Sequence, residues 1–239
     1  MTEALERAGV DVRVGMKAVA VRRDAGGVTV ELEGGEAVTG DELLVAVGRR
    51  PPTASFGLET VGLEPGKTIP VDDRCRALGS DWLYAIGDVN GRALLTHMGK
   101  YQGRIAADTI LGKERAIVSD GLHSPRVIFT DPQVCAVGHT EASALEAGIR
   151  VRVVEQGTSD NAGGSFYGRD TVGTSRLVVD EDRGVIVGAT ITGSEVADFL
   201  HAATIAVVGE VPLERLYHAV PSFPTRSEVW LNLLNAYGV

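Results

Sequence analysis

Cysteine is nearly absent from this chain of 239 residues. Its two cysteines, Cys75 and Cys135, stand alone without a CxxC or CxxxxC pair, which argues against a disulfide framework or a zinc site. An excess of basic residues is also missing, because 32 Asp and Glu outnumber 23 Lys and Arg to give a net charge of −9. That balance argues against nucleic acid or an anionic membrane as the partner.

Long hydrophobic runs and targeting signals are lacking as well. No apolar run approaches the ~20 residues that a membrane-spanning helix needs, and the polar N-terminus MTEALERAGVDV has no signal-peptide pattern. We therefore predict a cytoplasmic protein with no membrane partner and no metal site. Glycine is abundant instead: 30 of 239 residues is nearly twice the usual share of about 7%. This indicates many tight turns in a chain long enough for one or two domains.

The first 50 residues predict a small antiparallel sheet. After a helix at 2–8, the segments 10–24 and 26–32 alternate apolar and polar residues, which is the period of a strand. Glycine-rich hairpin turns separate them. Leu43–Val47 is almost wholly apolar, which is typical of a central strand covered on both faces.

The next segment predicts a strand, a turn and a helix. Residues 48–57 contain two adjacent prolines and are expected to form a loop. WLYAIGDV at 82–89 is predicted as a second apolar strand that stops abruptly at its Gly-Asp pair. Helical spacing of apolar residues then begins near Leu95 and ends at Gly112.

From about residue 122 the pattern predicts an antiparallel sheet with helices, an α+β arrangement. The expected strands are 126–130, 134–138, 151–156, 174–180 and 185–193. The expected helices are 140–148, with Thr140 forming a capping box with Ser143 or Glu141, 194–210, with Ser194 as N-cap, 212–220 and 227–238.

Two segments carry candidate chemistry. In LLVAVGRRPP the predicted strand ends at Gly48 and Arg49 follows, although an ordinary strand-to-loop turn explains this segment equally well. In LYAIGDVNGRALLTH a strand ends at Gly87-Asp88 and leads to a helix start near Leu95. Ligands bind at the carboxyl ends of strands in open α/β sheets; a carboxylate there accepts hydrogen bonds from sugar hydroxyls, and the helix start offers unpaired N–H groups. The alternative is that Asp88 only caps the turn.

Together these segments resemble the pyridine nucleotide-disulfide oxidoreductases, the flavoprotein family of dihydrolipoamide dehydrogenase, glutathione reductase, mercuric reductase and the soluble transhydrogenases. The family's A-x-G-R-x-P pattern is similar to Ala46–Pro51, its second flavin motif I-G-D to Ile86–Asp88, and the L-x-H that follows to Leu95–His97. FTDPQVCAVGHTEASA, which starts at Phe129, is similar to the family's F-T-x-P-x-x-x-x-V-G-x-T-E-x-x-A. The resemblance covers essentially the whole chain, as the C-terminal half of a complete member.

This resemblance implies a set of cofactor-binding residues. Asp88, placed by Gly87, would bind the ribityl chain of FAD. Gly48 would lie in the passage between the nicotinamide and flavin domains, with Arg49 either structural or near the cofactor. The backbone at the start of the helix would face the pyrimidine end of the isoalloxazine ring, where the helix dipole favours negative charge; its residues are Leu95, Thr96 and His97.

The resemblance also implies the domain organisation. Residues 1–47 would be the end of an NAD(P)-binding domain of the α/β class, and residues 48–119 the C-terminal part of an FAD-binding domain. Residues 120–239 would form a dimerisation (interface) domain built from an antiparallel sheet with helices, through which the protein forms a homodimer.

Two family features are missing from the sequence. Neither of the two G-x-G-x-x-G motifs that bind the FAD pyrophosphate and the NAD(P)H occurs, and GGSFYG at 163–168 is predicted to be a loop. The redox-active cysteine pair of the family is also absent, since it lies in the N-terminal flavin segment. We therefore expect either an engineered truncation or an internally started reading frame, whose cofactors FAD and NAD(P) belong to the full-length parent and not necessarily to this chain.

The stretch HAVPSFPTRSEVW stands where the family's disulfide reductases have H-P-x-x-x-E. In them the histidine is the acid–base catalyst and the glutamate orients it. Here Glu228 is kept, but Phe223 replaces the histidine and cannot move a proton. One explanation is an enzyme that reduces no disulfide, and the other is that His218 substitutes. His218 is otherwise a polar residue at a helix end, and Glu228 a carboxylate in a first helical turn capped by Thr225 or Ser227.

The sequence therefore predicts part of an FAD-dependent NAD(P)H oxidoreductase similar to dihydrolipoamide dehydrogenase. Hydride would pass from NAD(P)H to flavin and on to a small-molecule acceptor that is not a conventional disulfide. The alternative is a non-catalytic dimerisation module, because the chain lacks both nucleotide-binding motifs.

Overall fold

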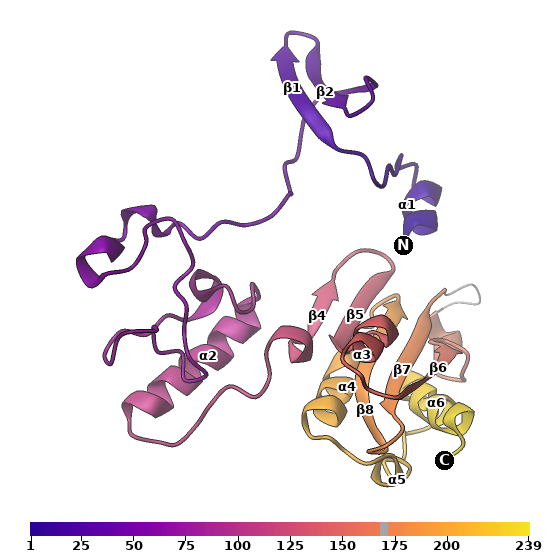
Figure 1. The fold of residues 1–239 in the computed structure, drawn as a ribbon. Helices are drawn as coiled ribbons and strands as arrows, with labels where there is room; N and C mark the ends of the chain where they lie inside the picture. The colour runs from indigo at the N-terminus through magenta and orange to yellow at the C-terminus, as the bar shows by residue number, and fades with distance from the viewer. Residues whose placement is uncertain (168–171) are drawn as a thin grey trace. The chain divides into compact units, whose positions relative to one another are not determined.

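The computed structural model describes residues 1–167 and 172–239. The chain forms two compact units, Met1–Arg50 and Pro51–Val239 (Figure 1).

The first unit is a helix followed by a three-stranded meander. It contains α1 (Thr2–Arg7), β1 (Ala18–Asp24), β2 (Gly27–Leu32) and β3 (Ala37–Gly40), with the strands paired antiparallel in the order β1-β2-β3. The alternating pattern and the glycine turns therefore predicted β2 and the second half of the first segment correctly, but residues 10–17 form no strand and β3 was not predicted.

The prediction of a central strand at Leu43–Val47 is wrong. The segment forms no strand, and Leu44, Val45 and Val47 are 89%, 67% and 93% exposed. A strand that is apolar on both faces is stable only when neighbouring strands and covering layers bury it. In the described residues of this unit, no strand pairs with Leu43–Val47 and no layer covers it.

The second unit begins with loops around one long helix. The short 3₁₀ helices η1 (Thr53–Ser55), η2 (Leu58–Val61) and η3 (Gly87–Asn90) precede α2 (Thr96–Ile110), and η4 (Gly121–His123) follows it. The helix ends as predicted, with Gly112 in the left-handed region at φ +78°.

The prediction of a strand at 82–89 is also wrong. Tyr84 makes one isolated bridge to Arg76, and the chain turns into η3 at Gly87. Ala85 is buried in a small cluster with Leu58 and Ile69. The apolar pattern thus predicted the burial of Ala85 correctly. The segment forms no strand because no described strand lies beside it to form a ladder.

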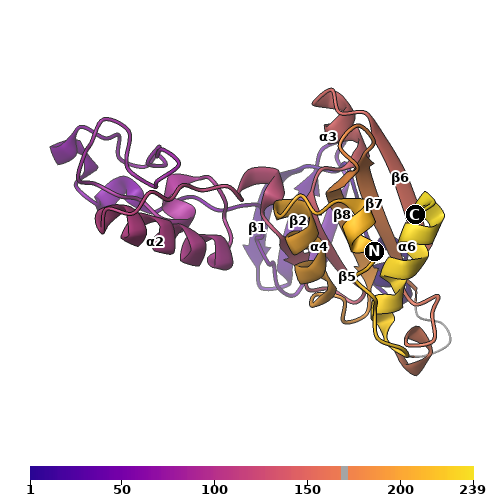
Figure 2. The same cartoon turned by 90° about the horizontal axis from the view of Figure 1, so that it is seen from below.

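The C-terminal part is a five-stranded antiparallel sheet with helices on both faces (Figure 2). The sheet order is β4 (Arg126–Ile128), β5 (Gln133–Gly138), β8 (Val185–Gly193), β7 (Thr174–Asp180) and β6 (Val151–Gly157). The helices are α3 (Glu141–Glu146), α4 (Phe199–Val208), α5 (Leu213–Leu216) and α6 (Val229–Tyr237), with the short η5 (Gly164–Tyr167) and η6 (Arg226–Glu228). The predicted α+β arrangement is confirmed.

Strand register sorts the side chains between the two faces. Leu177 pairs with Ala189, and both belong to the main core under α4 and α6. Arg176, one residue earlier, pairs with Thr190 on the opposite face, because successive strand residues alternate. At one end of that face Ala144 of α3 packs into a second, smaller core.

Local signals were right at one helix start and wrong at another. Thr140 and Ser143 form the predicted capping box of α3. Ser194, however, is not the N-cap of α4, which begins at Phe199 after Asp198. A turn intervenes because Glu195 adopts φ +51° and Val196 is fully buried. The described part of the predicted 163–168 loop is a loop with the η5 turn, and residue 168 lies outside the described residues.

Candidate functional site

The Gly87-Asp88 turn presents a carboxylate to solvent. Gly87 adopts φ +76°, which an L side chain rarely tolerates. The main-chain oxygen of Asp88 accepts from the Gly91 N–H at 3.2 Å. The Asp88 side chain is exposed and has no hydrogen-bond or ion-pair partner among the described residues. Its carboxylate therefore does not cap the turn and is available to a ligand.

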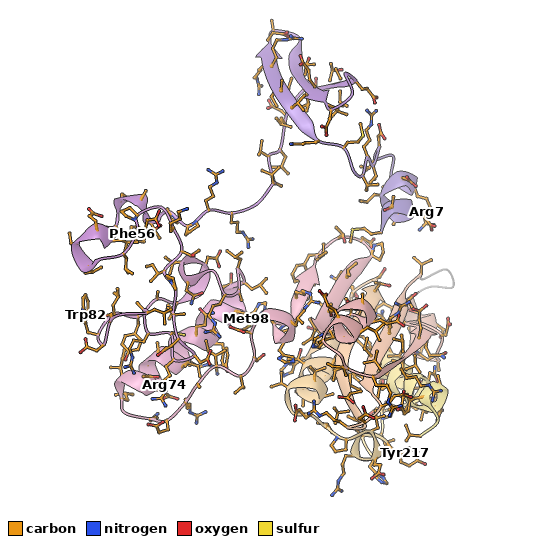
Figure 3. The ribbon with its side chains drawn as sticks, viewed as in Figure 1. Arg7, Phe56, Arg74, Trp82, Met98 and Tyr217 are labelled. Atoms are coloured by element: carbon orange, nitrogen blue, oxygen red, sulfur yellow. The ribbon has the colours of Figure 1, made fainter. Side chains whose placement is uncertain are left out.

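Two buried amide side chains hold this turn against α2. Gln102 Oε1 accepts from the Gly87 N–H at 2.7 Å and from Asn90 Nδ2 at 2.9 Å. Gln102 is 0% exposed and Asn90 6%. Neither residue was predicted from the sequence. A signal existed for Gln102, because it shares the buried face of α2 with Met98 (labelled in Figure 3) and Ile105.

The start of α2 lies beside the turn. A Cβ atom added at Gly99 would approach Gly87 Cα to 3.2 Å, so the two backbones are in contact. Leu95 is the N-cap residue and makes no side-chain cap. Its main-chain oxygen accepts from the Met98 N–H at 3.0 Å, which leaves the N–H groups of Thr96 and His97 at the positive end of the helix dipole. Thr96 and His97 are exposed.

His97 also ties α2 to the beginning of the sheet domain. Its Nε2–H donates to the Pro125 oxygen at 2.7 Å, just before β4. Because a carbonyl can only accept, this bond assigns the proton to Nε2. The structure thus brings Gly87, Asp88 and the α2 start together, as the motifs predicted.

The remaining predicted cofactor residues belong to the other unit. Gly48 adopts φ +141° and is exposed, and Arg49 is likewise exposed. Both lie in the Met1–Arg50 unit, in the predicted loop after the exposed apolar segment.

The candidate catalytic residues near the C-terminus, His218 and Glu228, are not joined to each other by a described contact. Phe223 is 76% exposed and precedes a cis proline. His218 is exposed and packs edge-on against Tyr217 at 5.3 Å. Glu228 ends η6 with Oε2 buried and without a hydrogen-bond partner among the described residues, and no described hydrogen bond or ion pair joins it to His218. Thr225 stands at the N-cap position of η6, but its hydroxyl donates to the Ser222 oxygen at 2.6 Å.

Arg226 is a buried cation that sequence reasoning missed. It is 5% exposed, and its guanidinium lies 4.3 Å from the Tyr167 ring and 5.1 Å from the Phe199 ring. Nε and Nη1 have no hydrogen-bond partner among the described residues. Cation–π contact with two rings stabilises the charge and links η5, α4 and η6. Arginine is seldom buried, so its residue type carried no signal for this.

The two thiols are unsuited to redox chemistry. Cys75 and Cys135 are both 0% exposed and unpaired. Burial raises the pKa of each thiol from 9.0 to about 11, so both are protonated at neutral pH and poor nucleophiles. In the described part of the chain no group of three or more His, Cys, Asp or Glu is placed to hold a metal ion.

An apolar groove of about 320 Å³ opens between α4, α5 and α6. Ile205, Leu216 and Trp230 line it, and Ile205 is 56% exposed. Tyr217, labelled in Figure 3 at the end of α5, is 57% exposed. Exposed apolar side chains therefore lie in and next to these helices.

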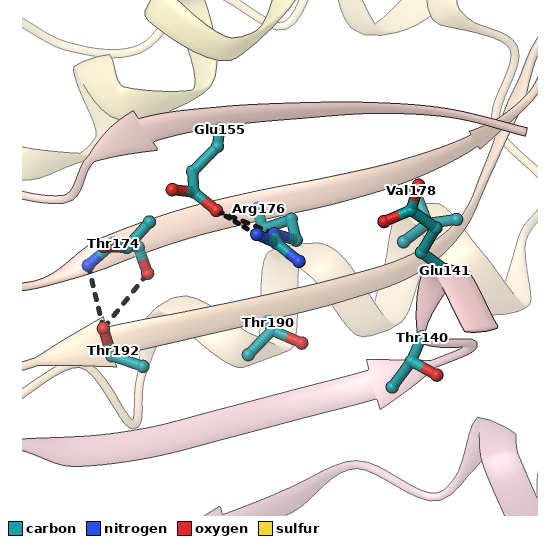
Figure 4. A pocket seen from close by; sticks show the side chains of 8 residues that line it. All are labelled: Thr140, Glu141, Glu155, Thr174, Arg176, Val178, Thr190 and Thr192. Carbon is teal, nitrogen blue, oxygen red and sulfur yellow. Dashed lines mark hydrogen bonds and ion pairs between the residues drawn. The ribbon is translucent and has the colours of Figure 1, made fainter. Parts of the chain in front are cut away.

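A second, polar cleft of about 290 Å³ lies on the opposite face of the sheet (Figure 4). Arg176 pairs there with Glu155 at 2.6 Å, and the Thr192 hydroxyl bonds to the Thr174 backbone. Glu141 also lines the cleft, but the Arg176 guanidinium is already paired with Glu155, which leaves this cation less available to a ligand.

None of the helices in the described ranges is both long and apolar enough to cross a lipid bilayer.

Comparison with known proteins gives two family matches. Residues 124–234 match the dimerisation domain of pyridine nucleotide-disulphide oxidoreductases, and residues 1–103 match the pyridine nucleotide-disulphide oxidoreductase model. Dihydrolipoyl dehydrogenase of Bacillus subtilis is 33% identical over 96% of this chain and 49% of that protein. Glutathione reductase of Burkholderia cepacia is 32% identical over 98% and 52%. The chain spans about half the length of the curated relatives it matches.

Solved structures share the fold. LpdA of Mycobacterium tuberculosis superimposes with a TM-score of 0.88 at 24% identity, over 99% of this chain and 51% of that protein. The flavoprotein disulfide reductase RclA of Escherichia coli gives 0.85 at 25% identity, over 98% and 54%.

Proposed function

We propose, from the premise that this chain belongs to the pyridine nucleotide-disulphide oxidoreductase family, that it forms part of an FAD-dependent NAD(P)H oxidoreductase. FAD would supply the hydride acceptor of the reaction, with electrons passing from NAD(P)H to the flavin and then to a small-molecule acceptor. What this chain contributes is the Asp88 carboxylate, the start of α2 and the surface for dimerisation.

The observation that carries the proposal is the contact between the Asp88 turn and α2. A solvent-facing carboxylate with no partner in the described part of the chain follows directly on Gly87, whose backbone touches Gly99 in the first turns of the helix. These groups fit one end of FAD: a carboxylate accepts hydrogen bonds from the ribityl hydroxyls, and the uncapped helix start favours negative charge at the flavin ring. The pyrophosphate has no matching G-x-G-x-x-G loop in this sequence.

The acceptor is proposed to be something other than a disulfide. Phe223 occupies the position of the family's acid–base histidine and is 76% exposed. A phenyl ring neither gives nor takes a proton, and both thiols of the chain are buried and protonated. Acceptors that need no thiol protonation fit this position better.

The proposed assembly is a homodimer through residues 120–239. The groove between α4, α5 and α6 is apolar, and Ile205 and Tyr217 remain exposed beside it. Covering this surface with a second copy would remove it from water, which favours association. The reduced state of Cys75 and Cys135 agrees with the cytoplasm as the proposed location.

A second candidate function is a dimerisation module without catalysis. It is favoured by the absence of both glycine-rich motifs and by the exposed apolar segment at Leu44–Val47. In that case the chain would dimerise and bind no flavin.

A visible absorption spectrum of the purified chain, recorded with its mass in solution, separates the two. The enzyme proposal expects FAD bound by the unaltered chain, with binding lost in Asp88→Ala and kept in the control Asp81→Ala, which changes another exposed aspartate nearby. A colourless dimer supports the module. A colourless monomer contradicts both.

A further inference from the structure

Gln102 is a fully buried polar side chain on a helix face that otherwise carries Met98 and Ile105. Burying an amide is unfavourable unless it is hydrogen-bonded. Its Oε1 has two donors, the Gly87 N–H at 2.7 Å and Asn90 Nδ2 at 2.9 Å. Its Nε2 has no partner among the described residues. The polar contacts of the buried Gln102 side chain are therefore the two hydrogen bonds that its oxygen accepts.

The orientation of the carboxamide follows from its neighbours. The Gly87 N–H can only donate, so the oxygen of Gln102 must face it. Asn90 Nδ2 also donates to the Ala85 oxygen at 3.0 Å, and Asn90 Oδ1 accepts from the Arg92 N–H at 3.0 Å. Two buried amides thus hold the turn from Ala85 to Arg92, where no strand ladder does so.

These bonds fix the turn at two points of α2. The side chain of Gln102 accepts from the Gly87 N–H. Gly99, which lies three residues before Gln102 on α2, packs against the Gly87 Cα. Asp88 follows Gly87 directly. The position of its carboxylate relative to the start of α2 therefore depends on the Gln102 oxygen.

We propose that Gln102 is the positioning residue of this site, holding Asp88 in register with the first turn of α2. The inference rests on the proposed function, in which those two elements bind the ribityl chain and the pyrimidine edge of FAD. Gln102 acts through Gly87 and does not itself touch the cofactor.

Amide hydrogen exchange at Gly87, followed by NMR in the 239-residue chain, tests the hold on the turn. Gln102→Leu removes the acceptor and should speed exchange about tenfold, the factor that corresponds to about 1.4 kcal/mol. Gln102→Glu keeps it, because a buried protonated carboxyl presents an oxygen to both donors and an O–H in place of Nε2; exchange should stay within about threefold. Gln102→Met replaces Gln102→Leu if circular dichroism finds the latter unfolded.

Affinity for FAD, measured by quenching of flavin fluorescence, tests positioning. Gln102→Leu should weaken binding about tenfold, and Gln102→Glu should restore it. Ile105→Val is the control, since it trims a buried side chain of the same helix in a separate cluster and costs stability without touching the turn.

Three results would overturn the inference: unchanged Gly87 exchange in Gln102→Leu, faster exchange with unaltered FAD affinity, or equal loss of affinity in Ile105→Val. Absence of FAD binding by the unaltered chain contradicts the proposed function instead. The exchange result and its rescue by Gln102→Glu then decide the role of Gln102.

Discussion

The buried thiol of Cys135 should make this protein sensitive to alkali. Cys135 is 0% exposed in the main core, and burial alone raises its pKa from 9.0 to about 11. The folded state thus binds the thiol proton more tightly than the unfolded chain. The contribution of the protonated thiol to the free energy of unfolding is fully present below pH 9. It is lost as the pH rises from 9 towards 11. At pH 10.5 the loss from this one thiol is about 2 kcal/mol.

The assay is urea unfolding at pH 7 and pH 10.5 for the unaltered chain and Cys135→Ala. The fixed packing cost of the substitution is the same at both pH values, and the other titrating groups are shared, so both cancel in the difference. The unaltered chain should lose about 2 kcal/mol more than Cys135→Ala between the two conditions. Val137→Ala, also 0% exposed on β5, is the control that removes core packing but no titrating group. A difference below about 0.5 kcal/mol, the usual size of incidental effects, would refute the reasoning.

Three further outcomes are expected. Gly188→Ala would drive a Cβ into the backbone oxygen of His139 and should lower the free energy of unfolding by about 1–3 kcal/mol, measured by urea titration; an unchanged midpoint contradicts this close approach. Ile205→Glu places a charge in the apolar groove and should shift the mass in solution towards monomer by light scattering, whereas an intact dimer would place the interface elsewhere. Phe223→His changes an exposed side chain and should alter the free energy of unfolding by less than about 0.5 kcal/mol, and a larger loss in thermal melts would mean that Phe223 is packed.

Local chemistry made much of the sheet domain predictable. Alternating apolar residues marked β6 and β7, and Thr140 with Ser143 formed the expected cap. These signals depend on neighbours in sequence. Ser194 failed because the buried Val196 and the left-handed Glu195 place a turn where the helical pattern begins, and no local propensity carries that information.

The candidate site also contains some residues that local signals predict and others that depend on tertiary contacts. The Gly87-Asp88 turn and the helix start could be located from the motif, because glycine and the helix pattern are local signals. Gln102 and Asn90 could not be assigned their roles, since their hydrogen bonds join residues 12 and 15 positions apart. The burial of Arg226 likewise depends on Tyr167 and Phe199, which come from distant segments.

The sequence by itself determined the strands and helices of the sheet domain and the family resemblance, and it predicts that Phe223 replaces the family's acid–base histidine. Those follow from residue identity and short-range periodicity. The tertiary structure alone decided which apolar segments found partners: Leu43–Val47 and 82–89 carry the pattern of buried strands, yet neither forms a ladder. A strand requires hydrogen-bonding neighbours on its edges, and whether they exist is a property of the fold and not of the segment.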